Sequence, residues 1–259
     1  MPYTGQRIRA TIEVVIDLEK PEEPTLGAVA TTESEGLRPP LDEKIAQIRT
    51  DVIRLGALAC EAVGAATQAL LDADLSAAER VIDNDLAVDE LAHFIEEHCA
   101  ELLALQAPVA TDLRRSLATL RIVHEIERSA DLMVNVAKAT RRLYPNHLDP
   151  KVRGIVDQMG TQAVAQLRLA IDAYADEDGN RAAALADMDE AMDELTKALF
   201  RRILALGDAN EANVQTSVQI ALVGRHYERA ADHAVTIAER VQYVVTGERP
   251  LPGSRHSYS

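Results

Sequence analysis

The sequence predicts an all-α protein made of two tandem, pseudo-symmetric three-helix bundles, with six long antiparallel helices in total. From residue 41 onward, apolar residues recur at alternating steps of three and four, which is the period of an amphipathic helix. Short turns containing proline, glycine or asparagine separate these stretches, and short turns between long helices make neighbours antiparallel. Acidic motifs near residues 85 and 127 return near residues 189 and 228, which indicates a repeated bundle and not a short solenoid unit.

The two ends of the chain differ from this helical body. Residues 1–40 are predicted to form a flexible N-terminal arm. Apolar residues alternate weakly over residues 8–18, which leaves a short edge strand open as an alternative for part of the arm. Prolines and small polar residues then follow up to Pro40, as in a linker. Residues 248–259 are predicted to be a C-terminal tail.

The first bundle is predicted over residues 41–146. Its first helix carries one continuous apolar stripe that begins near Ile45. Ser76, with Glu79 three residues later, has the spacing of a capping box and is expected to cap the second helix. The second helix should end before Pro108, because proline cannot continue a helix, and a third helix is expected from about Val109 to Leu143.

The second bundle is predicted over residues 147–247. Its three helices are expected near residues 149–177, 181–206 and 211–246. The composition suits such bundles, since the chain is 47% hydrophobic but contains no tryptophan and two phenylalanines. Small aliphatic side chains let helix axes approach closely, so we expect tightly packed helices.

Charge and cysteine usage exclude several classes of protein. The formal net charge is -15, so we expect no nucleic-acid partner, because such partners require a basic surface. Cys60 and Cys99 lie in apolar helical stretches and form neither a CxxC motif nor a disulfide framework, as in a reducing compartment. No apolar run is long enough to span a membrane, and the N-terminus lacks a signal-peptide pattern. We therefore expect a cytoplasmic protein that reaches a membrane only through partners.

Four acidic pairs with the spacing (Asp/Glu)-x-x-x-Asp are the candidate functional residues. Two pairs lie in each bundle, on its second and third helices. They are Asp85 and Asp89, Glu127 and Asp131, Asp189 and Asp193, and Glu228 and Asp232. Residues four apart share one helix face, where two ionised groups destabilise the helix by about 0.2–0.5 kcal/mol. The recurrence of these pairs in both halves therefore points to a use other than folding.

The acidic pair of the third helix continues a largely apolar stripe. The stripe advances by steps of three and four residues through Leu113, Leu117, Leu120 and His124, and its next members are Glu127 and Asp131. The sixth helix repeats this order, with valines ahead of its acidic pair. We therefore expect these carboxylates to be partly desolvated, which is costly for an unpaired charge.

Two kinds of interaction would offset the cost of desolvating these carboxylates. Neighbouring arginines, among them Arg128, Arg225 and Arg229, could form salt bridges on a solvated face. Alternatively, the second and third helices of each bundle could supply the oxygen ligands of a polynuclear metal site that holds hard or borderline cations. The occurrence of the pairs at equivalent positions in both halves favours the metal site.

A ferritin-like di-iron centre is the rival class of metal site. It requires Glu-x-x-His motifs on two helices of one four-helix bundle. Only Glu90 and His93 match here, and Lys197 replaces the histidine in the other half, so a metal-handling or ferritin-like protein stays as the alternative function. We find no phosphate-binding glycine loop, no Ser-His-Asp set at suitable spacing and no cofactor fingerprint, and we do not expect an enzyme.

Three segments carry a resemblance to a known family. Residues 103–114 (LALQAPVATDLR) resemble the turn between the second and third helices of the PhoU family, the phosphate-specific transport system accessory proteins. Residues 127–131 (ERSAD) and 228–232 (ERAAD) resemble its Glu-Arg-x-x-Asp signature, although Ser-Ala and Ala-Ala replace the usual Ile-Gly. The resemblance covers about residues 41–247.

The resemblance implies a cytoplasmic regulator of phosphate uptake. Such a protein would be an adaptor that couples the ATPase subunit of a phosphate ABC transporter to a sensor histidine kinase and represses the phosphate-starvation response when phosphate is plentiful. The resemblance also implies a homodimer with multinuclear metal clusters. Iron or zinc are the first candidates, and magnesium or manganese are the alternatives. Carried over to this chain, the metal ligands would be the eight acidic residues named above.

Overall fold

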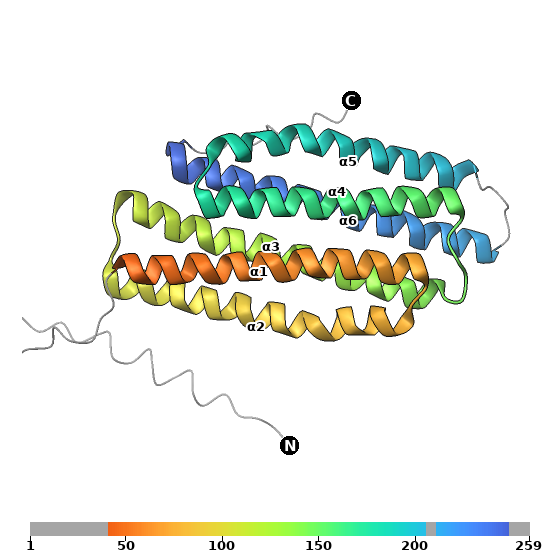
Figure 1. The fold of residues 1–259 in the computed structure, drawn as a ribbon, viewed down its shortest axis with the longest axis horizontal. Coiled ribbons are helices and arrows are strands. Elements are labelled where there is room, and N and C mark those ends of the chain that lie inside the picture. The colour runs from red at the N-terminus through yellow and green to blue at the C-terminus, as the bar shows by residue number, and fades with distance from the viewer. Residues whose placement is uncertain (1–40, 206–210, 249–259) are drawn as a thin grey trace, which may run out of the picture. The chain divides into compact units, whose positions relative to one another are not determined.

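The computed structural model describes residues 41–205 and 211–248, apart from the side chains of residues 186, 187, 211 and 212, and the predicted all-α fold is confirmed there. The helices are α1 (Leu41–Asp72), α2 (Leu75–Gln106), α3 (Ala110–Leu143), α4 (Pro150–Asp176), α5 (Gly179–Ala205) and α6 (Glu211–Thr246) (Figure 1). The predicted N-terminal arm, the C-terminal tail beyond residue 248 and the break near residue 207 lie outside the described residues.

The helices of each predicted bundle pack against one another. Helices α1, α2 and α3 all contact one another, and helices α4, α5 and α6 do the same. The two halves meet where α1 packs against α4 and where α3 packs against α6 (Figure 1). Both halves belong to one unit, Pro39–Ser259, and the predicted boundary between residues 146 and 147 stays a prediction.

Two glycines allow α1 and α4 to approach closely. A Cβ atom on Gly56 would lie 2.6 Å from Ile171, and a Cβ on Gly160 would lie 2.5 Å from Thr67. The two glycines are 104 residues apart, as are Thr67 and Ile171, so each half supplies both sides of the same contact. These contacts leave no room for a methyl group in a close-packed interior.

Arginines extend this reciprocal arrangement to the helix ends. Arg49 of α1 donates to Glu177 Oε1 (2.6 Å), just after the end of α4. Arg153 of α4, 104 residues later, donates to Asp72 Oδ1 (3.1 Å) at the end of α1. Each arginine also donates to a backbone carbonyl near the end of the helix that it caps, that is, α4 for Arg49 and α1 for Arg153. Carbonyls in the last turn of a helix lack intrahelical partners. Each half therefore caps the first helix of the other.

The predicted cap of α2 is wrong by two residues. Asp74 is the N-cap, and its carboxylate accepts a hydrogen bond from the Ala77 backbone N–H at 3.0 Å. The helix begins at Leu75, so Ser76 already lies within its first turn. Both aspartate and serine make good caps, and the sharp connection after α1 selects the earlier residue.

The apolar stripe of α3 that leads to Glu127 and Asp131 faces away from the core over its first turns. Leu113 and Leu117 are exposed, whereas the core of α3 is formed by a neighbouring stripe that includes Ile122, Ile126 and Met133. Helix α3 is apolar on more than one face, and the face that packs against α1, α2 and α6 is the neighbouring one. None of the described helices combines the length and apolar composition that a membrane span requires.

Candidate metal centre

The first acidic quartet (Asp85, Asp89, Glu127 and Asp131) lies on two helices that pack against each other. Asp85 and Asp89 are one turn apart on α2, and Glu127 and Asp131 are one turn apart on α3. Three of the four side chains are partly buried, and Asp131 is exposed. The quartet therefore lies at the edge of the helix pair, where solvent and ions have access.

The charges of the quartet act on one another. Partial burial and the negative charges of Asp89, Asp131 and Glu127 together raise the pKa of Asp85 from 3.8 to about 6, against the opposing charge of Lys138. A pKa shift from neighbouring carboxylates requires them to lie near Asp85. The structure thus places the four predicted residues of the first half near one another, and the expected partial desolvation is found for Glu127 but not for Asp131.

The second acidic quartet (Asp189, Asp193, Glu228 and Asp232) lies on α5 and α6, which pack against each other as α2 and α3 do. Asp189, Asp193 and Glu228 are partly buried, and Asp232 is exposed. This distribution of burial matches that of the first quartet position by position. The two halves therefore bury their acids to a similar extent.

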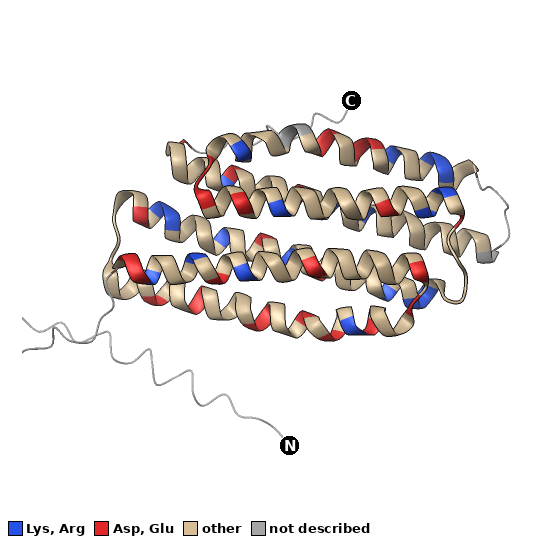
Figure 2. Cartoon of the chain, viewed as in Figure 1, with Lys and Arg blue, Asp and Glu red and all other residues tan. Residues whose placement is uncertain are grey.

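The salt-bridge explanation holds for part of the second quartet. Arg225 forms an ion pair with Glu228, one turn away on α6. In the first half, the corresponding contact of Glu127 is to His124, whose Nδ1 lies 3.4 Å from Glu127 Oε2. Figure 2 shows acidic residues along the whole of α2, and Arg80 is the one lysine or arginine of that helix. The glutamate of the second quartet is therefore paired with an arginine, whereas the equivalent glutamate of the first quartet is paired with a histidine.

The donor chemistry of both quartets fits a metal, whereas the present positions of the side chains are not those of a finished site. Carboxylate oxygens from two helices suit hard and borderline cations. In the described part of the chain, no three Asp, Glu, His or Cys side chains are grouped so that they could hold an ion as they stand. Metal binding would therefore require the carboxylates of a quartet to turn toward one another.

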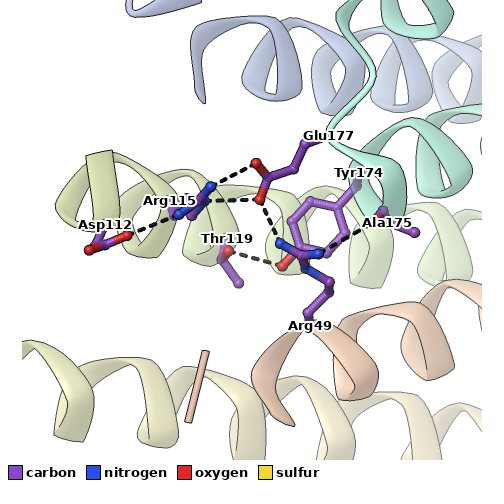
Figure 3. A network of polar contacts seen from close by, with 7 residues as sticks. All are labelled: Arg49, Asp112, Arg115, Thr119, Tyr174, Ala175 and Glu177. Atoms are coloured by element: carbon purple, nitrogen blue, oxygen red, sulfur yellow. Dashed lines mark hydrogen bonds and ion pairs between the residues drawn. The ribbon is translucent and has the colours of Figure 1, made fainter. Parts of the chain in front are cut away.

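The sequence did not reveal the polar network that links the two halves (Figure 3). Arg115 of α3 donates to both oxygens of Glu177, at 2.9 and 2.8 Å, and to Asp112 at 3.0 Å. Arg49 of α1 reaches the same Glu177 carboxylate, so two guanidinium groups of the first half hold one acid of the second. The available signal was the 104-residue spacing of Arg49 and Arg153, which equals the spacing of the acidic pairs on α2 and α5.

A small cavity beneath this network has a volume of about 30 Å³. Its lining includes Cys99, Thr119 and Tyr174, and the hydroxyl groups of the last two lie 3.1 Å apart. Burial raises the pKa of the Cys99 thiol to about 12, which makes it unreactive. The volume is sufficient for at least one water molecule.

Comparisons with known proteins agree with the sequence resemblance. The family model described as the PhoU domain matches residues 52–140 and 156–241. The chain is 38% identical to phosphate-specific transport system accessory protein PhoU homolog 1 of Mycobacterium leprae, over 85% of this chain and 100% of that protein. It is 37% identical to PhoU homolog 2 of Mycobacterium tuberculosis, over 83% of this chain and 100% of that protein.

Solved structures agree as well. The phosphate transport system regulatory protein PhoU from Streptococcus pneumoniae superposes with a TM-score of 0.75 and 30% identity, over 82% of this chain and 100% of that one. PhoU from Pseudomonas aeruginosa gives a TM-score of 0.76 and 28% identity, over 80% of this chain and 100% of that one.

Proposed function

This chain belongs to the PhoU family, and we propose that it is an accessory protein of a phosphate-specific transport system. In this proposal it is a cytoplasmic adaptor that couples the ATPase subunit of the transporter to a sensor histidine kinase. It thereby keeps the phosphate-starvation response off while phosphate is plentiful. The names of its relatives describe accessory and regulatory proteins, which supports a role other than catalysis.

Exposed apolar turns on the helices that carry the acidic pairs Glu127/Asp131 and Glu228/Asp232 support the adaptor proposal. Leu113 and Leu117, at the start of α3, are 38% and 46% exposed. Val214 and Val218, at the start of α6, are 54% and 51% exposed. Neighbouring apolar side chains on one exposed helix face mark surfaces that contact other proteins. Since the acidic pair follows on the same face of each helix, a partner with apolar and basic side chains would complement both surfaces.

The direction of the helices supports two partners. Helices α3 and α6 run in opposite directions, so their apolar first turns lie toward opposite ends of the helix pair (Figure 1). One such surface would contact the ATPase subunit and the other the kinase. In the same proposal the protein is a homodimer and associates with the membrane only through these partners.

We assign metal binding to the two quartets, with iron or zinc as first candidates and magnesium or manganese as alternatives. Asp85, Asp89, Glu127 and Asp131 would hold the first cluster, and the second quartet would hold the other. A bound cation would offset the repulsion that raises the pKa of Asp85. Carboxylates bind ions only when ionised, so acidification to about pH 4 should release the metal.

Capture of the two partners tests the adaptor proposal. Leu117→Glu and Val218→Glu place a charge on each exposed apolar turn, and each should abolish recovery of one partner from a lysate. The matched control is Ile53→Glu, at an exposed apolar position of α1. Recovery should also weaken as salt rises, because complementary charges contribute to binding.

Undiminished recovery of both partners by the double variant would contradict the adaptor proposal. An iron-oxidation assay separates it from the alternative of a metal-handling, ferritin-like protein. An adaptor should show no turnover of iron beyond the ions that it binds.

A further inference from the structure

The two acidic quartets differ in the side chains that flank them. In the first half, His93 lies one turn after Asp89 on α2, and His124 lies one turn before Glu127 on α3. Helices α2 and α3 are antiparallel (Figure 1), so a turn forward on one corresponds to a turn backward on the other. The two histidines therefore flank the same end of the first quartet.

Both histidines would add donor nitrogens to the first quartet if its side chains turned toward one another. They are exposed, and each lies on the helix face that carries its acidic pair. His93 Nδ1 lies 3.0 Å from the Asp89 carbonyl oxygen, and donation of its proton there leaves the lone pair of Nε2 free for a ligand. His124 Nδ1 lies 3.4 Å from a carboxylate oxygen of Glu127.

The second half has permanent cations at both equivalent positions. Lys197 lies one turn after Asp193 on α5, and Arg225 lies one turn before Glu228 on α6. Arg225 is already paired with Glu228. Lys197 Nζ donates to Glu194 at 2.9 Å, and the negative charges of Glu194 and Asp193 help to raise the pKa of the lysine. Lysine and arginine stay charged at neutral pH, whereas histidine is largely neutral.

We propose that the two quartets bind metal unequally, and that the first, with its two imidazoles, is the tight site for a borderline dication such as Zn²⁺. This inference rests on the metal-binding part of the proposed function. Imidazole nitrogens add to the carboxylate oxygens the donor type that such cations prefer. In the second quartet, Lys197 and Arg225 repel a dication, and Arg225 competes with it for the Glu228 carboxylate. The second quartet is therefore the weaker site.

Zinc titration of full-length variants separates the two sites. Asp193→Asn with Asp232→Asn disables the second quartet, and Asp89→Asn with Asp131→Asn disables the first. Calorimetry against a competing chelator and elemental analysis after gel filtration measure affinity and stoichiometry. We expect the first variant to keep the tight site and the second to bind Zn²⁺ at least about tenfold more weakly. Circular dichroism confirms that both variants are folded.

Exchange of the flanking residues tests the cause of the difference. His93→Lys with His124→Arg should weaken the tight site at least about tenfold, and Lys197→His with Arg225→His should create a second tight site. The matched control is His147→Arg, at an exposed position between α3 and α4. In the unaltered protein, Zn²⁺ should also shift the imidazole NMR resonances of His93 and His124.

Three results would overturn the inference. The first is equal affinity of the two quartets for Zn²⁺, and the second is exchange variants that bind Zn²⁺ like the unaltered protein. Either result would leave the proposed metal binding intact. Absence of Zn²⁺ binding by either quartet would overturn both the inference and the metal-binding proposal. Partner capture would then still decide the adaptor proposal, because it does not depend on zinc.

Discussion

Replacement of Asp85 by asparagine should stabilise the metal-free protein at neutral pH. The pKa of Asp85 is raised from 3.8 to about 6 by partial burial and by neighbouring carboxylates. A carboxyl whose pKa is raised in the folded state favours folding below about pH 4, and this contribution is lost as the pH rises through about 6. The shift corresponds to about 3 kcal/mol without screening. Because the side chain is partly exposed, solvent screening reduces this to about 1 kcal/mol.

Thermal unfolding at two pH values measures this effect. Asp85→Asn should raise the Tm of metal-free protein by about 2–4 °C at pH 7 and leave it unchanged at pH 4. Asp83→Asn, at an exposed position of the same helix, is the matched control and should change little at either pH. A fall in Tm at pH 7, or the same difference at both pH values, would refute the reasoning. It would show that Asp85 stabilises the fold as an ion-pair partner.

Three further substitutions test the contacts between the two halves. Gly160→Ala forces a Cβ against Thr67 and should cost about 1–3 kcal/mol in urea unfolding, whereas Gly154→Ala, which meets no neighbouring atom, should not destabilise. Tyr227→Phe removes a buried hydroxyl that lies 2.7 Å from Thr67 Oγ1 and should lower the free energy of unfolding by about 1 kcal/mol. Glu177→Gln should also destabilise, and high salt should shrink its difference from the unaltered protein, because two arginines hold this partly exposed carboxylate.

The helices could be predicted from the sequence because apolar periodicity and turn residues agree along the whole described body. The predicted start of the third helix, at about Val109, and the observed start at Ala110 differ by one residue, which is within the ordinary uncertainty of helix ends. The cap at Ser76 failed for a related reason. Two good capping residues stand two positions apart, and the path of the chain after α1 decides between them.

Burial on α3 could not be predicted from periodicity alone. The helix has an apolar stripe through Leu113 and Leu117 and another through Ile122 and Ile126, and both have helical spacing. The choice between them depends on three neighbouring helices, one of which lies in the other half of the chain. The exposed stripe is the surface on which the adaptor proposal rests.

The candidate metal residues were predictable as a set because their pairs recur in both halves. Their proximity across α2 and α3 follows from the antiparallel packing of consecutive helices, which the short turn predicts. The network of Arg49, Arg115 and Glu177 was not predictable, because it joins residues more than 60 positions apart on three different elements. The assignment of metal to the quartets stays a prediction.

Expression of phosphate-starvation genes in a deletion strain tests the central claim most directly. The claim is that this PhoU-family chain couples phosphate transport to repression of that response. In phosphate-rich medium, a strain that lacks the gene should express these genes at the level of a starved wild type, and the gene supplied in trans should restore repression. Repression equal to that of the wild type in the deletion strain would contradict the account.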